Sequence, residues 1–205
     1  MKLKPAPRRY TQTARAQSAE DTARRILEAF LERLMTDWFD EITLDRVAAD
    51  AGVTVQTVVR RFGGKEGLLT NAVKIMAVQI RARRGEAVGD IGSVVEGIID
   101  DYEATGDAVI RLLALEPRHP ALKEVLDFGR SEHRDWSSTA FGEALSKLNL
   151  AVRNRALDAL VVNTDVYTWK LLRRDMGRST AETAGIMKCL VEATIAEFTK
   201  PNRKH

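Results

Sequence analysis

Cysteine is almost absent from the 205 residues of this chain, and Cys189 stands alone. A single cysteine excludes an internal disulfide and is typical of a reducing compartment. Its place within an apolar helical pattern predicts a core position rather than a redox switch. No apolar run approaches the ~20 residues that a membrane-spanning helix needs, and no charged-then-apolar signal segment opens the sequence. We therefore expect a cytoplasmic protein with no membrane partner.

Residue patterns for catalysis and metal binding are also missing. Glu116, His119 and His133 are conceivable metal ligands, but they form no His-x-x-x-His pair. The sequence has no glycine-rich phosphate loop after a strand, and no Ser or Cys nucleophile on a recognisable elbow. We expect no enzymatic activity, no metal and no cofactor.

Helical periodicity runs through the whole sequence instead. The hydrophobic content of 44% is that of a globular chain, and every periodic segment has apolar residues at helical rather than alternating spacing. The sequence therefore predicts an all-α protein. Its expected parts are a flexible basic arm (1–17), a helix-turn-helix domain (18–64), a larger helical domain for ligand binding and dimerisation (65–200) and a tail (201–205).

Capping residues and glycines predict the helix boundaries. We expect Ser18 to cap the first helix, with Asp21 three residues later, and Lys65 to begin a helix that Gly85 ends. Ser179 is expected to cap the last helix. The segments between them are predicted as helices over 94–102, 108–115, 122–145 with a break at 137–138, and 154–174.

The stretch 43–62, TLDRVAADAGVTVQTVVRRF, is the most informative part of the chain. Thr43 is a suitable N-cap for a short helix that buries Val47 and Ala48 on one face. Gly52 ends that helix, since glycine adopts the left-handed conformation without steric cost, and Thr54 caps a second one. Two short helices joined in this way form a helix-turn-helix, whose second helix enters the major groove of DNA.

The second helix has side chains suited to DNA. Gln56 and Thr57 can hydrogen bond to base edges, and Arg60 and Arg61 can reach phosphates or a guanine. The alternative is a helical hairpin within an ordinary all-α core, although a buried hairpin has no use for Gln-Thr at its tip and paired arginines behind. The candidate DNA-contacting residues are Thr43, Arg46, Thr54, Val55, Gln56, Thr57, Arg60, Arg61 and Lys65.

From Arg25 to Leu69 the chain resembles the N-terminal domain of the TetR family of transcriptional regulators. The resemblance covers about a fifth of the protein. It rests on Ile26-Leu27 and Ala29 in the first helix, Phe39 before the capping Thr43, Val47-Ala48, Ala51-Gly52-Val53-Thr54, Thr57, Phe62, and the closing Lys65-Glu66 with Leu68-Leu69. It implies a dimeric DNA-binding regulator whose two C-terminal helices pack against their symmetry mates as a four-helix bundle.

Three residues depart from the family pattern. Trp38 stands where the family usually has glycine, Val59 where it usually has a tyrosine that contacts phosphate, and Arg61 where histidine or tyrosine is common. The fold does not depend on these positions. We expect Arg60 or Arg61 to replace the phosphate contact of the tyrosine.

Charge is distributed unevenly along the chain, whose net charge is only +3. Residues 1–17 contain no acid, and the segment 51–84 has seven basic residues against Glu66 alone. Pro5 and Pro7 disfavour a helix at the N-terminus, and a flexible basic arm before a helix-turn-helix can lie along phosphates or in a minor groove. The alternative is a solvated tail with no partner. The basic residues of the arm are Lys2, Lys4, Arg8, Arg9 and Arg15.

The segments 154–174 and 179–198 have more apolar residues than one packed face needs, which favours an isologous dimer over a monomer with central helices. A ligand cavity between helices is also expected. Aromatic residues at helical spacing are more often core than cavity wall, and a carboxylate at Asp165 must find a partner or face solvent. The candidate ligand-binding residues are Tyr102, Arg111, Phe128, His133, Trp136, Asp165 and Trp169, with Phe141 and Glu116 as further candidates.

Together these features predict a ligand-responsive dimeric repressor that binds a palindromic operator on double-stranded DNA. In the resembling family, a small ligand in the C-terminal domain changes the spacing of the two recognition helices and so releases the operator. The alternative is a ligand-independent DNA-binding architectural or interaction protein with a purely structural C-terminal domain. A tightly packed C-terminal domain would favour that alternative, whereas a cavity with a few convergent polar groups would favour a sensor.

Overall fold

A computed structural model describes residues 9–85 and 89–200 of the chain. All regular elements within these residues are helical, so the predicted all-α fold class is confirmed. The chain divides into two compact units, residues 1–72 (unit 1) and 73–205 (unit 2). The first eight residues of the predicted arm and the predicted tail lie outside the described residues. None of the helices in the described part is long and apolar enough to cross a membrane.

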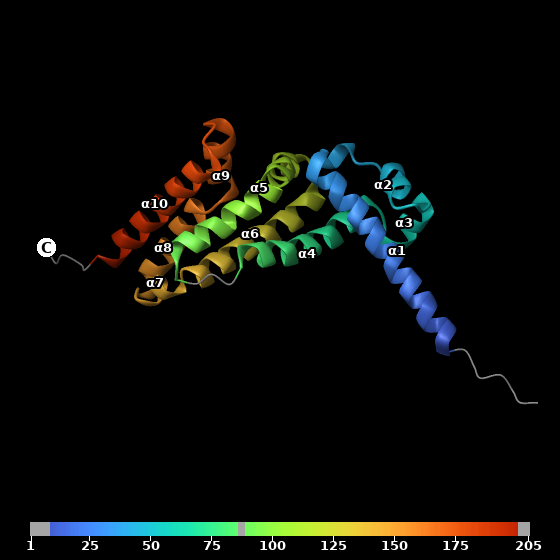
Figure 1. The fold of residues 1–205 in the computed structure, drawn as a ribbon, viewed down its shortest axis with the longest axis horizontal. Coiled ribbons are helices and arrows are strands. Elements are labelled where there is room, and N and C mark those ends of the chain that lie inside the picture. Colours follow the sequence, from blue (N-terminus) through green and yellow to red (C-terminus); the bar gives the residue numbers. More distant parts are fainter. Residues whose placement is uncertain (1–8, 86–88, 201–205) are drawn as a thin grey trace, which may run out of the picture. The chain divides into compact units, whose positions relative to one another are not determined.

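Unit 1 is a small helical domain built around one apolar core. Its elements are α1 (Arg9–Thr36), a 3₁₀ turn η1 (Phe39–Glu41), α2 (Leu44–Asp50), α3 (Val55–Phe62) and the first two turns of α4 (Lys65–Arg84). α2 packs against both α1 and α3 (Figure 1). The fully buried side chains that join these helices are Ile26, Phe30, Leu34, Ile42, Val47, Val58, Leu68 and Leu69.

The first helix begins earlier than the sequence predicted. α1 starts at Arg9, so Ser18 is not an N-cap but an interior residue whose carbonyl accepts a hydrogen bond from Thr22 Oγ1. The part of the predicted arm from residue 9 to residue 17 is therefore helical. The reason is the absence of Pro and Gly after Pro7, because Ala14, Ala16 and their neighbours extend a helix at little cost.

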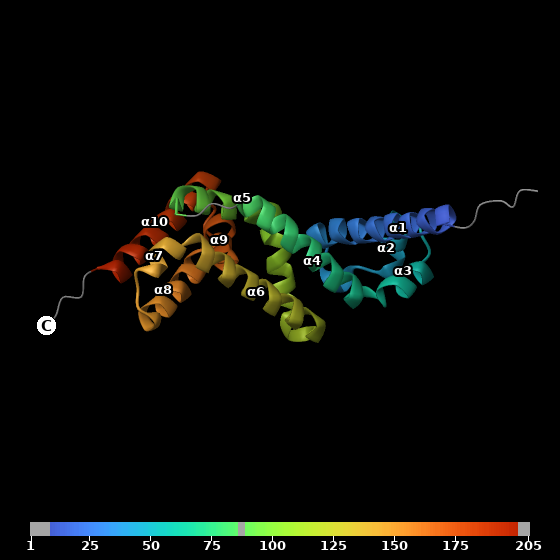
Figure 2. The ribbon, with the colours of Figure 1, turned by 90° about the horizontal axis from the view of Figure 1, so that it is seen from below.

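Unit 2 is a bundle that begins with the remainder of α4. Figures 1 and 2 show α5 and α6 as its longest elements, with α10 against α5 and α8, and α6 against α5 and α8. Its other elements are α5 (Ile91–Leu115), η2 (Glu116–Arg118), α6 (Pro120–Ala140), α7 (Gly142–Ser146), α8 (Leu150–Asn163), α9 (Val166–Lys170), a π-helical turn η3 (Leu171–Asp175) and α10 (Thr180–Thr199).

Several predicted helix boundaries in unit 2 are wrong. The two predicted helices over 94–102 and 108–115 are one continuous helix, α5. α6 runs through Ser137, whose hydroxyl donates to the carbonyl of His133, and ends before Phe141 rather than at 137–138. The single helix predicted over 154–174 is divided into α8, α9 and η3, because Asp165 accepts a hydrogen bond from Tyr167 N and so begins a new helix.

The start of α10 confirms one predicted boundary, whereas the predicted burial of one of its side chains is wrong. Ser179 caps the helix in a reciprocal capping box with Glu182, as predicted. Cys189, expected in the core, is exposed. The physical reason is that α10 buries only the face that contains Thr183, Met187 and Val191, and Cys189 lies two residues from that face in each direction.

Gly106 is a packing residue within α5 rather than a helix end. A Cβ at this position would lie 2.5 Å from Cζ3 of Trp169, whose ring is completely buried. The Trp169 ring also lies 5.9 Å from the Tyr102 ring, and Arg174 covers it at 4.5 Å. The glycine therefore allows α5 and α9 to approach closely.

We expect Gly106→Ala to lower the free energy of unfolding by about 1–3 kcal/mol, since overpacking a well-filled core costs that much and outweighs the better helix propensity of alanine. Chemical denaturation measures the change. Gly129→Ala in α6 is the matched control, because no atom lies within 4 Å of its added Cβ. It should be neutral or stabilising by up to about 1 kcal/mol. Equal effects of the two substitutions would contradict this role for Gly106.

Candidate DNA-reading helix and ligand cavity

Two short helices in unit 1 form the helix-turn-helix that the sequence predicted. Thr43 Oγ1 accepts from Arg46 N at the start of α2, and Thr54 Oγ1 accepts from Thr57 N at the start of α3. Gly52 closes α2 with a φ of +64°, and Val53 N donates to Ala48 O at 2.9 Å. These local hydrogen bonds fix the turn and therefore the direction of α3.

α3 turns one face inward and presents the other to solvent. Val58 is completely buried, whereas Gln56, Val59, Arg60 and Arg61 are exposed. Of the other candidates, Val55 and Thr57 are half-buried, and Thr43, Arg46 and Thr54 are exposed. The Thr57 hydroxyl lies 3.0 Å from that of Thr54, so the two hydroxyls share a hydrogen bond.

Neighbouring elements hold both ends of the motif. Arg33 on α1 donates to Asp50 at the end of α2 over 2.6 Å. At the end of α3, a Cβ on Gly67 would lie 1.7 Å from the carbonyl oxygen of Phe62, so only glycine permits this approach of α4 to α3. The end of α2 is thus held by α1 and the end of α3 by α4, and both contacts lie outside the motif itself.

A surface hollow of about 600 Å³ lies between α1 and α3. Ser18 and Thr22 line it from α1, and the candidates Thr54, Thr57, Arg60 and Arg61 line it from the motif. Hydroxyl and guanidinium donors of this kind suit phosphate oxygens. The sequence reasoning missed Ser18 and Thr22 because it assigned Ser18 to a helix cap, and no local signal indicates that α1 continues beside α3.

Lys65 has a structural role in place of the predicted phosphate contact. Its ammonium donates to the carbonyl oxygens of Phe39, Asp40 and Ile42 at 2.8, 3.3 and 3.0 Å, and lies 4.6 Å from the centre of the Phe39 ring. Burial lowers the pKa of this ammonium, and Asp40 opposes the shift. Three carbonyls use the three donors of the side chain, so none is left for DNA.

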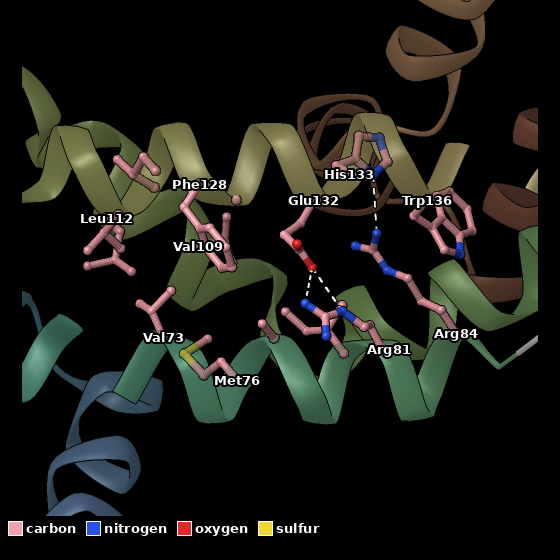
Figure 3. A pocket seen from close by; sticks show the side chains of 15 residues that line it. Val73, Met76, Arg81, Arg84, Val109, Leu112, Phe128, Glu132, His133 and Trp136 are labelled. Carbon is pink, nitrogen blue, oxygen red and sulfur yellow. Dashed lines mark hydrogen bonds and ion pairs between the residues drawn. The ribbon is translucent and has the colours of Figure 1, made fainter. Parts of the chain in front are cut away.

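Unit 2 contains a cavity of about 130 Å³ between α4, α5 and α6, which we call the unit 2 cavity (Figure 3). Its walls are almost entirely apolar. Phe128 and Trp136, both on α6, are the two ligand candidates that supply aromatic wall. The aliphatic lining residues are Val73, Met76, Ala77 and Ile80 on α4, Val109 and Leu112 on α5, and Val125 and Leu126 on α6.

One end of the cavity is polar. Arg81 and Arg84 extend from α4 toward Glu132 and His133 on α6 (Figure 3). Arg81 Nε donates to Glu132 over 2.8 Å, and Arg84 Nη1 lies 3.2 Å from His133 Nδ1. Behind this end, the buried Asp101 on α5 accepts hydrogen bonds from the Nε atoms of both Arg83 and Arg84, at 3.1 and 3.0 Å.

His133 is neutral in this environment. Burial lowers its pKa to about 4, and the nearby charge of Arg84 adds to the shift. Because Arg84 can only donate, Nδ1 of His133 is the acceptor and Nε2 carries the proton, which it donates to the carbonyl of Val161 at 3.3 Å. His133 stacks on Trp136 with ring centres 5.6 Å apart, so the imidazole is held in place.

The remaining ligand candidates lie outside the cavity lining. Tyr102 is buried and donates its hydroxyl to Thr164 O at 2.9 Å, and burial raises its pKa. Trp169 is in the core, where its Nε1 donates to Glu103 at 2.9 Å. Burial raises the pKa of the half-buried Asp165, which caps α9. Arg111 is half-buried on α5 and is not a lining residue.

Arg81, Arg84 and Glu132 are cavity residues that sequence reasoning missed. The two arginines were counted only as part of a basic segment, although their spacing of three places them on one face of a helix. Whether a face of α4 borders a cavity depends on how α5 and α6 pack beside it. The sequence of 65–84 alone therefore did not indicate that Arg81 and Arg84 line a cavity. No group of three His, Cys, Asp or Glu side chains within the described ranges is placed to hold a metal ion.

Comparisons with known proteins show similarity at the level of the fold. A transcriptional regulator from Rhodococcus sp. Rha1 has a similar crystal structure with a TM-score of 0.66 and 15% identity, over 85% of this chain and 95% of that one. A protein assigned as a transcriptional regulator from Pseudomonas aeruginosa PAO1 has a TM-score of 0.63 and 18% identity, over 84% of this chain and 89% of that one. No protein-family model and no curated protein sequence matches the chain.

We expect Lys65→Met to lower the free energy of unfolding by about 1–3 kcal/mol, since it removes the donor to three carbonyls while keeping the apolar stem. Chemical denaturation followed by circular dichroism measures this change. Arg61→Met is the matched control, because Arg61 is exposed and its loss should leave stability within about 0.5 kcal/mol. A Lys65 variant as stable as the control would contradict the structural role.

His133 should make stability depend on pH. Its pKa in the folded protein is about 4, below the ordinary 6.5, so the unfolded chain binds a proton first as pH falls. Stability should therefore decrease from about pH 6.5 toward pH 4, by about 3 kcal/mol in full at 1.36 kcal/mol per pH unit. Denaturation at pH 7.0 and 5.0 measures the first part of this loss. His133→Gln keeps a donor and an acceptor without titrating, and should show a smaller loss. An equal loss in both proteins would exclude His133 as the cause.

Proposed function

We propose that this chain is a TetR-like dimeric DNA-binding transcriptional regulator that responds to a small ligand. The observation that carries the proposal is the capped α2–α3 pair, which leaves Gln56, Arg60 and Arg61 exposed on α3. The two similar crystal structures of transcriptional regulators support it at the level of the fold. No catalytic role is part of the proposal.

In the proposed complex, α3 enters the major groove of double-stranded DNA. Gln56 near its N-terminus contacts base edges, because a carboxamide can bond an adenine in two places. Arg60 and Arg61 near its C-terminus contact phosphates and replace the tyrosine that the resembling family has at Val59. Ser18, which lines the hollow beside α3, adds a hydroxyl donor to the same DNA backbone.

The proposed dimer forms through α8 and α10. Both helices expose large apolar side chains, with Val162 on α8 at 63% exposed and Ile186 and Leu190 on α10 at 37% and 40%. Asn163 on α8 donates to the carbonyl of Leu190 at 3.1 Å, so the two helices present these residues together. An isologous interface of this kind sets the spacing of two recognition helices on a palindrome.

The unit 2 cavity supports a ligand sensor over the architectural alternative, because it combines apolar walls with a few convergent polar groups at one end. α4 contributes its first eight residues to unit 1 and Val73 to Arg84 to unit 2. A ligand that moves the cavity wall on α4 therefore acts on a helix that unit 1 shares. Repression is the proposed outcome on DNA, since blocking a promoter requires only occupancy.

Selection of bound duplexes from a randomised pool tests this function without a known operator. We expect the purified protein to enrich one sequence with two-fold symmetry and half-sites about 34–36 Å apart or a multiple of that distance. Enrichment of a two-fold symmetric site would indicate both that the protein recognises a DNA sequence and that it binds as a dimer. Failure to enrich any sequence would contradict the proposed function.

Gln56→Ala should weaken binding to the enriched duplex by about 1–3 kcal/mol and binding to random DNA very little, because it removes a base contact. Arg61→Ala should weaken both and lower the salt dependence of log K by about one, because it removes a phosphate contact. Fluorescence anisotropy at several salt concentrations measures both. The same loss on both duplexes for Gln56→Ala would show that Gln56 does not read bases.

A further inference from the structure

We propose that the unit 2 cavity binds a small monocarboxylate whose apolar body is about the size of one aromatic ring. The inference rests on the proposed function, since it names the chemical class of the ligand that the regulator would sense. The observations that carry it are the volume of the cavity, the charge of its polar end and the exchangeable ion pair at that end.

The volume limits the apolar body of the ligand. A dry cavity of about 150 Å³ in a protein admits benzene, so a cavity of about 130 Å³ suits a single ring or a branched chain of similar size. The walls are aliphatic on α4 and α5, and Phe128 and Trp136 add aromatic surface from α6. Such walls offer contact to an apolar body and no hydrogen bonds along its length.

The charge at the polar end favours an anion. Of the four polar lining residues, Arg81 and Arg84 are cationic, Glu132 is anionic and His133 is neutral. Behind them, Arg83 and Arg84 share the single carboxylate of Asp101. Arg83 Nη2 is buried and hydrogen bonds to none of the described residues. Among the residues that line the cavity, the polar end therefore has two guanidinium groups and one carboxylate.

Two more acidic residues lie near this end. Asp135 borders a surface hollow that Arg81 and Glu132 also line, and it is not a residue of the cavity lining. Asp165 interacts with Arg84 at longer range, and burial raises the pKa of its carboxyl, which disfavours its charged form. Its oxygen accepts from Tyr167 N at the start of α9 rather than from an arginine. A carboxylate from outside the chain would be a second carboxylate for the two guanidinium groups of the lining, Arg81 and Arg84.

Arg81 and Glu132 form a pair that a ligand can exchange. Arg81 is 60% exposed and Glu132 34% exposed, and such solvent-exposed pairs contribute little to stability. Arg84, by contrast, is held by Asp101 and His133 and is covered by the Trp136 ring at 4.9 Å. Because Arg81 and Arg84 lie one turn apart on α4, a carboxylate between them can replace Glu132 on Arg81 and approach the fixed charge of Arg84.

Calorimetric titration of the full-length protein with three ligands of one ring tests this proposal. Benzoate, benzyl alcohol and benzylamine differ mainly in the charge of the polar group. We expect benzoate to bind roughly tenfold more tightly than benzyl alcohol, and benzylamine to bind least, because only benzoate brings a negatively charged acceptor to the arginines. Equal affinity for the three ligands, or no binding of benzoate, would overturn the proposal.

Two variants of the exchangeable pair locate the site. Arg81→Gln should weaken benzoate binding roughly tenfold and leave benzyl alcohol unchanged, since it removes one charged donor. Glu132→Gln should tighten benzoate binding, because it removes the competing carboxylate. Arg134→Gln is the matched control on α6, since Arg134 also forms an ion pair, with Asp158, but does not line the cavity. Benzoate binding that is the same in all three variants would place the ligand elsewhere and overturn the proposal.

The calorimetric titration contains no DNA, so its outcome is independent of whether the protein binds DNA. Enrichment of a duplex without benzoate binding would overturn only the carboxylate ligand. Benzoate binding that responds to Arg81→Gln, without enrichment of any duplex, would overturn only the DNA-binding function.

Discussion

The buried pairing of Arg84 with Asp101 is the contact on which the polar end of the unit 2 cavity depends. A guanidinium and a carboxylate that are almost completely removed from water must stay paired, because loss of one partner leaves a buried charge at a cost of about 3–5 kcal/mol. The pair joins the end of α4 to α5. It also places the charge of Arg84 beside His133, where it adds to the effect of burial in lowering the pKa of the imidazole, and beside Trp136 at the polar end of the cavity. The position of α4, the charge of the cavity and the tautomer of His133 all follow from this one contact.

The sequence was sufficient where the decisive interaction is local. Thr43, Thr54 and Ser179 each cap a helix through a backbone N–H three residues away, and Gly52 turns the chain within a single residue. These features depend on only a few neighbouring residues, so a pattern in the sequence predicts them. The same reasoning failed over 103–107, where it predicted a break between two helices, whereas Gly106 lies within α5 and admits the ring of Trp169, a residue that lies far along the chain.

The candidate ligand residues show the same contrast between features that local sequence predicts and features that depend on distant residues. Trp136 and Trp169 have similar helical spacing to their apolar neighbours, yet one lines the cavity and the other fills the core. What separates them is the helix opposite each ring, Arg84 on α4 for Trp136 and Gly106 on α5 for Trp169. Lys65 was likewise assigned to DNA from its place after α3, whereas its ammonium closes a turn that lies 23 to 26 residues earlier. A basic residue at the right place in a motif does not reveal whether its charge faces the solvent or the chain.

The contacts of α4 indicate where a ligand can act on it. At its end, α4 is attached to α5 through the buried Arg84–Asp101 pair, and one turn earlier it forms the exposed Arg81–Glu132 pair with α6. A coupling between two sites typically amounts to about 1–3 kcal/mol. That energy is enough to exchange an exposed ion pair and a few apolar contacts, but it is less than the cost of breaking the buried pair. A ligand-driven shift of α4 that costs no more than this coupling energy must leave Arg84 in place. The part of α4 that such a shift displaces is the preceding segment from Val73 to Ile80, which lines the cavity.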